Sequence, residues 1–222
     1  NCGYLIAAPE GPKLSPLSEA LAAQLARGIE VIKLSQQEAT ERLPICRFDD
    51  AALIGFEPEA GFADAYLVAS SYARVARRLG VKFMEGENVT RLLLEQHKVV
   101  GVETKRGVFH APVVISTQSI WSQELTQWTG IEVPLLPERH KVIALEGPEA
   151  YTYSMPVYKD LGSPGMLYCR SYGGRQMLVS EGTAGEALSW PDNNQGNISM
   201  NDVVNLGEQV SERFPSFAEA GL

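Results

Sequence analysis

The chain has 222 residues, of which 45% are hydrophobic, a composition typical of a globular protein with one large domain or two smaller ones. Its 19 Lys and Arg against 27 Asp and Glu give a formal net charge of −8, and no basic run occurs, which argues against nucleic acid or an anionic membrane surface as the main partner. No apolar stretch approaches the roughly 18 residues of a membrane span and no signal-peptide pattern is present, so we expect a cytoplasmic protein.

The first sixty residues predict alternating strands and helices. A strand begins at once at Cys2, so we expect the chain to be a piece of a longer protein. Ser15 followed by Pro16 predicts a helix start with Ser15 as the cap, and leucines then recur on one face until Gly28. The remaining elements expected here are strands over 30–34 and 51–56 and a helix over 36–42 capped by Ser35.

An amphipathic helix follows, with Asp64 as its cap and Gly80 just past its end. The pattern predicts an apolar face, with a basic face of Arg74, Arg77 and Arg78 opposite. The expected apolar face consists of Val68, Tyr72, Val75, Ala76 and Leu79.

Residues 81–116 read as strands. A short strand is expected over 81–84, and a three-stranded meander over 89–95, 99–104 and 107–110. The nearly all-apolar segment 111–116 predicts a strand buried on both faces of a parallel sheet.

The second half of the chain is predicted to consist mainly of strands between two helices. A helix over 119–129 is expected to precede an antiparallel sheet, and a last helix should run from a cap at Ser199 to Phe214. The sheet strands are expected over 141–145, 155–158, 166–170 and 176–181.

Several familiar sites are missing from the sequence. The three histidines are too scattered for a metal site, and the three cysteines form no Cys-x-x-Cys pair, so we expect no metal and reduced, buried thiols. Neither a Gly-x-Gly-x-x-Gly fingerprint nor a P-loop stands at any strand-to-helix turn. If a dinucleotide binds, its phosphates must be held by residues outside such a turn.

The order of predicted elements and motifs along the chain resembles that of the FAD-dependent amino-acid oxidoreductases of the D-amino-acid oxidase superfamily. This group includes glycine oxidase, sarcosine oxidase and D-amino-acid dehydrogenase. The resemblance covers essentially the whole chain and is sharpest over residues 61–130. The segments that carry it are Gly61-Phe62-Ala63-Asp64, the amphipathic helix, Glu87-Asn88-Val89-Thr90, Val113-Val114-Ile115-Ser116-Thr117 with Trp121-Ser122, Pro156-Val157-Tyr158-Lys159-Asp160 and Gly165-Met166-Leu167-Tyr168-Cys169-Arg170.

The resemblance implies a mixed α+β or α/β fold: an antiparallel or mixed substrate-domain sheet with flanking helices, plus part of an FAD-binding α/β layer. The implied division is 1–61 for the first part of the substrate domain, 62–130 for part of the FAD-binding domain, 131–200 for the substrate-domain sheet and 201–222 for a helix that returns to the FAD domain. It also implies a central fragment, with the glycine-rich FAD motif before Asn1 and a flavin-contacting segment after Leu222.

The implied activity is oxidation of the C–N bond of an amino acid or secondary amine by hydride transfer to FAD. The resemblance places the backbone of Val89 at the adenine end of FAD and Ser116, Thr117 and Trp121 near its other parts. No catalytic residue is nominated.

For the substrate carboxylate, an Arg fork is a suitable clamp, and Arg170 and Tyr168, two apart on one strand, project to the same face. We therefore predict Arg170 as the carboxylate anchor and Tyr158 and Tyr168 as pocket walls, with His140 and Arg139 as weaker candidates.

Two alternatives stay open at this point. The final electron acceptor of such an enzyme could be oxygen or a quinone. A cofactor-free binding or interaction domain of the same fold is the alternative to an enzyme.

Overall fold

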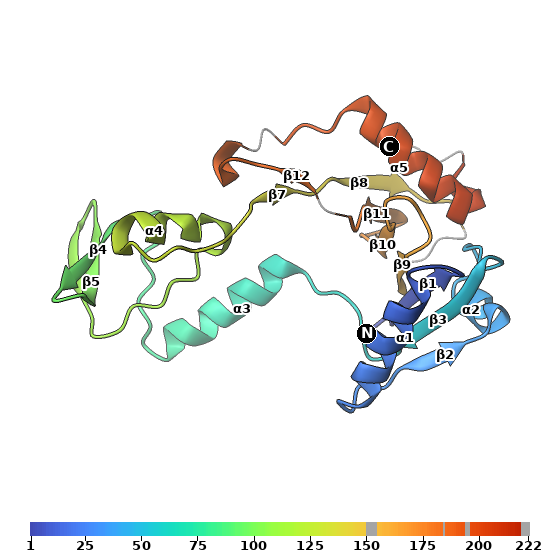
Figure 1. The fold of residues 1–222 in the computed structure, drawn as a ribbon, viewed down its shortest axis with the longest axis horizontal. Helices are drawn as coiled ribbons and strands as arrows, with labels where there is room; N and C mark the ends of the chain where they lie inside the picture. The colour runs from blue at the N-terminus through green and yellow to red at the C-terminus, as the bar shows by residue number, and fades with distance from the viewer. Residues whose placement is uncertain (150–154, 184, 194–195, 219–222) are drawn as a thin grey trace. The chain divides into compact units, whose positions relative to one another are not determined.

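A computed structural model describes residues 1–149, 155–183, 185–193 and 196–218 (Figure 1). Its contacts divide the chain into two compact units. The first unit comprises Asn1–Ala63, His140–Gly185 and Gly196–Leu222, and the second comprises Asp64–Arg139 and Glu186–Gln195. Both mix strands and helices, so the predicted mixed fold with flanking helices is confirmed.

The first unit is built on a seven-stranded mixed sheet in the order β2-β3-β1-β9-β10-β11-β8. Neighbouring strands are antiparallel except for β1 and β9, which are parallel. The predicted strands of this region are present, with ends shifted by one or two residues. Their bounds are β1 Tyr4–Pro9, β2 Ile32–Leu34, β3 Ala51–Glu57, β8 Val142–Glu146, β9 Val157–Asp160, β10 Tyr168–Ser171 and β11 Gln176–Ser180.

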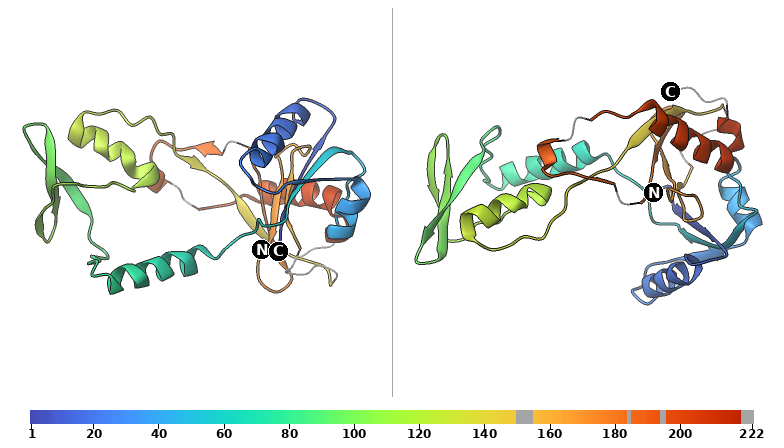
Figure 2. Two further views of the ribbon diagram at one scale, coloured as in Figure 1. Left: turned by 90° about the horizontal axis from the view of Figure 1, so that it is seen from below. Right: turned by 45° about the horizontal axis from the view of Figure 1, so that its top comes forward.

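One face of this sheet carries the main core. Side chains such as Leu5, Tyr158 and Val179 are at most 1% exposed there. Three elements cover this face, as the right-hand view of Figure 2 shows for the last helix: α2 (Gln36–Arg42), α5 (Met200–Arg213) and the turn η3 (Pro215–Phe217).

The opposite face is covered only in part by helices of this unit. Helix α1 (Leu14–Leu25) packs Leu17 and Leu21 over β1 and β3, in a smaller apolar cluster. Further along the sheet, alternate side chains of β9, β10 and β11 are half-buried. We call this part the open face, and it consists of Lys159, Tyr168, Arg170, Leu178 and Ser180.

The helix caps follow the sequence in three of four cases. Ser35, Asp64 and Ser199 each accept a backbone N–H bond at the start of their helices, as predicted. The predicted cap at Ser15 is wrong. Helix α1 begins at Leu14, and the Ser15 hydroxyl lies inside the helix and donates to Glu19 at 2.9 Å.

The second unit contains the predicted meander. Strands β4 (Val89–Glu95), β5 (Lys98–Thr104) and β6 (Gly107–His110) form a three-stranded antiparallel sheet. The other elements of this unit are α3 (Ala65–Arg78), the turn η1 (Ser119–Gln123), α4 (Glu124–Thr129), the pair β7 (Glu138–Arg139) with β12 (Glu186–Ala187), and the turn η2 (Pro191–Asn193).

Two strands predicted for this unit are absent from the described structure. Residues 81–84 and 111–116 form no strand, although Ala111 donates its N–H to the Val100 carbonyl of β5 at 3.0 Å. Val113 and Ile115 are 71% and 82% exposed. A β-strand forms only when its backbone hydrogen-bonds to a neighbouring strand, and an apolar sequence does not provide that neighbour. The prediction that 111–116 is buried on both faces is therefore wrong for this structure.

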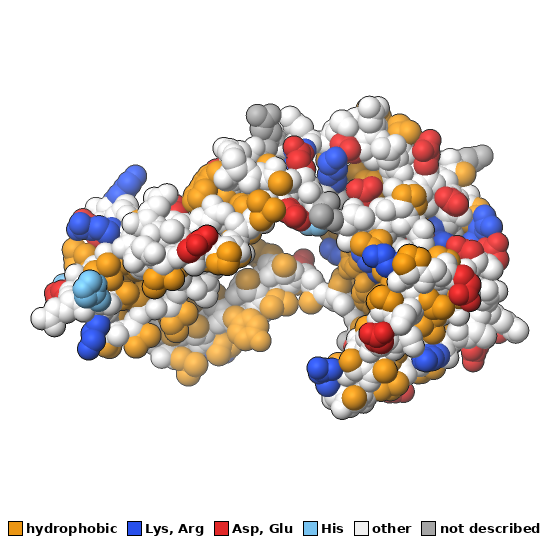
Figure 3. All heavy atoms as spheres, in the orientation of Figure 1, with side chains coloured by type: hydrophobic (Ala, Val, Ile, Leu, Met, Phe, Trp, Pro, Cys, Tyr) orange, Lys and Arg blue, Asp and Glu red, His pale blue; other side chains and the backbone are white. Residues whose placement is uncertain are grey.

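Helix α3 is amphipathic but does not bury its apolar face. Tyr72 is 77% and Leu79 is 80% exposed, and hydrophobic side chains gather on the surface over this helix (Figure 3). The predicted amphipathic helix is confirmed, with Asp64 as its cap and Gly80 just past its end, and none of its residues is buried in the described structure.

An ion-pair cluster around the largely buried Arg213 side chain joins three segments of the first unit. Arg213, at the end of α5, donates Nε to Asp160 of β9 at 2.9 Å. Its other nitrogens donate to both carboxylate oxygens of Asp50, at 2.6 and 3.0 Å, and to the Arg47 carbonyl at 2.8 Å. One guanidinium thus joins α5, β9 and the segment before β3.

Replacing Arg213 by Met should lower the free energy of unfolding by about 3–5 kcal/mol, because the Asp160 carboxylate would stay buried without its partner. Denaturant unfolding checks this. Arg47→Met is the matched control: its pair with Asp49 is exposed and screened by solvent, so the free energy of unfolding should change much less than in Arg213→Met. Equal effects of the two substitutions would contradict the account.

The same cluster predicts that the free energy of unfolding falls at acidic pH. The hydrogen bond from Arg213 holds the pKa of Asp50 below its usual value of 3.8 in the folded protein. The stabilisation is complete above 3.8 and is lost as the pH falls through the lower, folded pKa. Unfolding free energies measured from pH 6 to 2 should fall less steeply in Asp50→Asn than in the unchanged protein; parallel curves would contradict this.

Candidate functional site

The four predicted cofactor residues meet around one hollow of the second unit. It has a volume of about 570 Å³, and Val89, Ser116, Thr117 and Trp121 all line it. Val89 comes from the start of β4, Ser116 and Thr117 from the extended segment after β6, and Trp121 from η1. The sequence separated these residues by up to 32 positions, and the structure brings them together.

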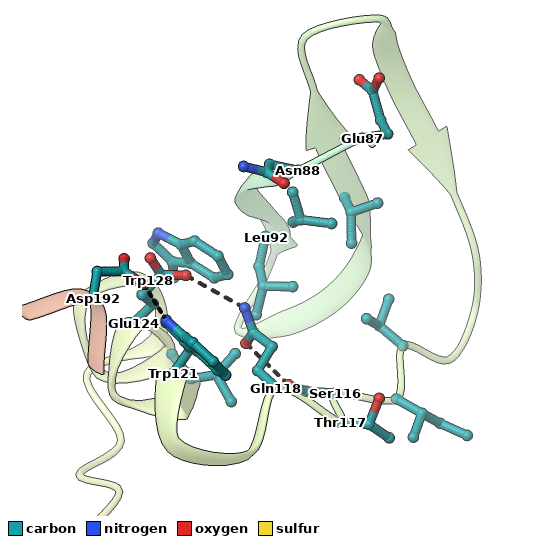
Figure 4. Close-up of a pocket in the computed structure, with 15 residues that line it drawn as sticks. Glu87, Asn88, Leu92, Ser116, Thr117, Gln118, Trp121, Glu124, Trp128 and Asp192 are labelled. Atoms are coloured by element: carbon teal, nitrogen blue, oxygen red, sulfur yellow. Dashed lines mark hydrogen bonds between the residues drawn. The ribbon is translucent and has the colours of Figure 1, made fainter. Parts of the chain in front are cut away.

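A short polar chain runs along one wall of this hollow (Figure 4). The Ser116 hydroxyl donates to Gln118 Oε1 at 3.0 Å, and Gln118 Nε2 donates to Glu124 Oε2 at 3.3 Å. The hydrogen bonds tie the segment before η1 to the first turn of α4.

Asp192 closes another side of the hollow. Its two carboxylate oxygens accept the indole N–H of Trp121 at 3.1 Å and that of Trp190 at 3.2 Å. The carboxylate thus fixes the orientation of the Trp121 ring. Sequence reasoning missed Asp192, Gln118 and Glu124. No local pattern links Asp192 to Trp121, which lies about 70 residues away along the chain.

The charge of the hollow limits which part of FAD fits it. The charged residues in its lining, Glu87, Glu124 and Asp192, are all acidic. Hydrogen bonding from Thr104 lowers the pKa of Glu87, which also pairs with Arg106 at 2.8 Å. Such a lining repels a pyrophosphate but offers acceptors to an adenine amine or to sugar hydroxyls. The residues therefore fit the uncharged parts of FAD.

The predicted substrate residues Tyr168 and Arg170 share the open face of the first unit. The Tyr168 ring lies 6.4 Å from that of Tyr4, and burial raises the pKa of both phenols, that of Tyr4 to about 12. The Arg170 guanidinium lies 4.8 Å from the Phe62 ring and 6.0 Å from the Tyr172 ring. It donates one N–H to the Ser171 carbonyl at 3.1 Å, which leaves other N–H groups for a ligand.

Tyr158 lies on the opposite face of the sheet. It is 1% exposed, and Phe48 and Phe214 pack edge-on against its ring with centroids at 5.7 Å. Strand alternation causes this, because Tyr158 stands opposite Cys169, not opposite Tyr168. The structure therefore does not bring Tyr158 to the open face.

The two weaker candidates lie elsewhere. Arg139, in β7 of the second unit, forms an ion pair with Glu186 of β12. His140 is exposed and follows β7 directly. Neither is a neighbour of Tyr168 in the strand pairing of the seven-stranded sheet.

Among the residues that the structure describes, the His, Cys, Asp and Glu side chains form no group of three or more that could hold a metal ion. No helix in this part of the chain combines the length and hydropathy that a transmembrane segment requires.

The contacts of Asp192 predict a spectroscopic result. The chain has three tryptophans, and in Asp192→Ala the indole N–H resonances of Trp121 and Trp190 should shift while that of Trp128 stays. Two-dimensional ¹H–¹⁵N spectra check this. Glu124→Gln, a change in the same hollow, should leave the Trp190 resonance in place; three unmoved indole signals in Asp192→Ala would contradict the geometry.

A family model described as FAD dependent oxidoreductase (DAO) matches residues 1–221. The chain is 25% identical over 178 residues to 4-methylaminobutanoate oxidase (formaldehyde-forming) of Paenarthrobacter nicotinovorans, covering 80% of this chain and 21% of that protein. It is 32% identical over 123 residues to sarcosine oxidase subunit beta of an Arthrobacter species, covering 53% of this chain and 30% of the relative.

Solved structures share the fold. L-proline dehydrogenase from P. horikoshii superposes with a TM-score of 0.86 at 17% identity, over 98% of this chain and 57% of that one. Glycine oxidase from Geobacillus kaustophilus gives 0.76 at 19% identity, over 98% and 55%. The chain thus spans little more than half of these structures and less than a third of the two curated relatives.

Proposed function

Because the chain belongs to the family of FAD-dependent oxidoreductases, we propose that the whole protein oxidises the C–N bond of an amino acid or a secondary amine with FAD. The observation that carries the proposal is the meeting of Val89, Ser116, Thr117 and Trp121 around one hollow that suits the uncharged parts of FAD. The second unit is then part of the FAD-binding domain, and the first is the substrate domain.

When bound, FAD accepts a hydride, that is, two electrons and one proton, from the substrate carbon that carries the nitrogen. The substrate loses in addition the proton on nitrogen and becomes an imine, which water converts into a carbonyl compound and the free amine. The task of the chain is to hold the substrate with this carbon oriented for transfer.

The open face supplies groups for that task. Tyr168 offers a flat, half-buried wall, and Arg170 is held in place by two aromatic rings with N–H groups still available for a carboxylate. Their common face follows from their spacing of two on β10. A cytoplasmic location, expected from the sequence, belongs to the same proposal.

The test is made on the whole protein. Purified protein should carry one FAD per chain, and its flavin absorbance should bleach without oxygen on addition of an amino acid or N-alkyl amino acid, but not of the matching hydroxy acid. Protein that folds without flavin and binds none on addition would contradict the proposal and favour the cofactor-free alternative.

A matched pair of variants tests the hollow. Trp121→Ala should weaken FAD binding at least tenfold, because the ring is part of the lining. Trp190→Ala loses an equivalent bond to Asp192, but Trp190 lies outside the lining, so FAD affinity should change less than threefold. Equal losses in fluorescence titrations would contradict this placement.

A further inference from the structure

Lys159 is a cation on the open face that no part of the sequence analysis singled out. It stands in β9 directly opposite Tyr168 of β10, so the two side chains share a face. Arg170, two residues along β10 from Tyr168, is the diagonal neighbour of Lys159 on the same face. The Lys159 side chain is half-buried.

The ammonium of Lys159 has no partner among the described residues. No hydrogen bond or ion pair joins it to any of them, and burial lowers its pKa. Two acidic residues adjacent in sequence to Lys159 and to Gly182 bind other side chains: Asp160 binds Arg213 on the buried face, and Glu181 accepts from Gln209 at 3.3 Å. An unneutralised, half-buried charge costs free energy that an anionic ligand would recover.

Gly182 makes room for this ammonium. A Cβ built at Gly182 would lie 1.5 Å from Lys159 Nζ, so the amine occupies the space of the missing side chain. The backbone of Gly182 is not in the left-handed region, so its conformation does not require glycine. The absence of a side chain at 182 therefore serves the close approach of Lys159.

The two cations extend to opposite sides of Tyr168. The niche of Lys159 lies beside Gly182 and the Met166 carbonyl, before the start of β10. The Arg170 guanidinium lies toward Tyr172, past the end of the strand. A ligand over the Tyr168 ring would thus meet a positive group at each end.

From this arrangement we infer that the substrate carries two anionic groups: an amine with two carboxylates, one held by Arg170 and the other by Lys159. The inference rests on the proposed function for the oxidation itself. It names the class of substrate, dicarboxylic amino acids or N-carboxyalkyl amino acids.

Kinetics on the flavin-loaded whole protein test the inference with pairs of substrates that differ by one carboxylate: N-ethylglycine against N-(carboxymethyl)glycine, and 2-aminobutanoate against aspartate, in both enantiomers. The unchanged protein should prefer the dicarboxylate by at least tenfold in kcat/KM. Lys159→Met should lower this preference at least tenfold, and Lys159→Arg should restore part of it. Lys98→Met, an exposed change of equal charge in the second unit, should leave the preference unchanged.

Gly182→Ala is a second variant, which displaces the ammonium without removing it, and it should lower the preference in the same direction. Equal losses for both members of a pair in Lys159→Met, or no loss for either, would overturn the inference.

Calorimetric binding of succinate against butanoate supplies a readout that needs no turnover. Succinate should bind at least tenfold more tightly to the unchanged protein, and Lys159→Met should remove the difference. If the protein binds no flavin but still binds succinate more tightly than butanoate, the proposed function is refuted and the two-carboxylate site on Lys159 and Arg170 is retained. If the protein is an active flavoenzyme that binds both ligands equally, only the two-carboxylate site is refuted.

Discussion

The arrangement of the first unit depends on the burial of one guanidinium. Arg213 neutralises Asp160, which is 1% exposed at the end of β9, and binds Asp50 before β3 with its other side. The end of α5 is thereby fixed to the middle of the sheet. Without its partner the Asp160 carboxylate would be buried unpaired, which is strongly destabilising, so the position of β9 depends on a residue more than fifty positions away.

Once the position of β9 is fixed, the alternation of side chains along the strand determines which face of the sheet each residue occupies. Asp160 and Tyr158 face the core with Cys169, and Lys159 between them must face the other way, opposite Tyr168. A shift of one residue in this pairing would bury the lysine and expose the aspartate. The chemistry proposed for the open face and the stability of the core are thus consequences of one register.

The sequence predicted most of the fold because local signals specify it. Capping side chains marked three helix starts, and alternating apolar residues marked the meander and the strands of the large sheet. Residues 111–116 show the limit of this approach, since composition can favour a strand but only a neighbour makes one. Among site residues, spacing placed Tyr168 and Arg170 together, whereas the face of Tyr158, the contacts of Asp192 and the niche of Lys159 depend on pairings between distant segments.

The most direct measurement of the central claim is a crystal structure of the whole protein with FAD and succinate. The account predicts a succinate over the Tyr168 ring, with one carboxylate on Lys159 Nζ and the other on the Arg170 guanidinium, and the FAD pyrophosphate outside the acidic hollow. Succinate bound away from the open face, or a pyrophosphate among Glu87, Glu124 and Asp192, would contradict it.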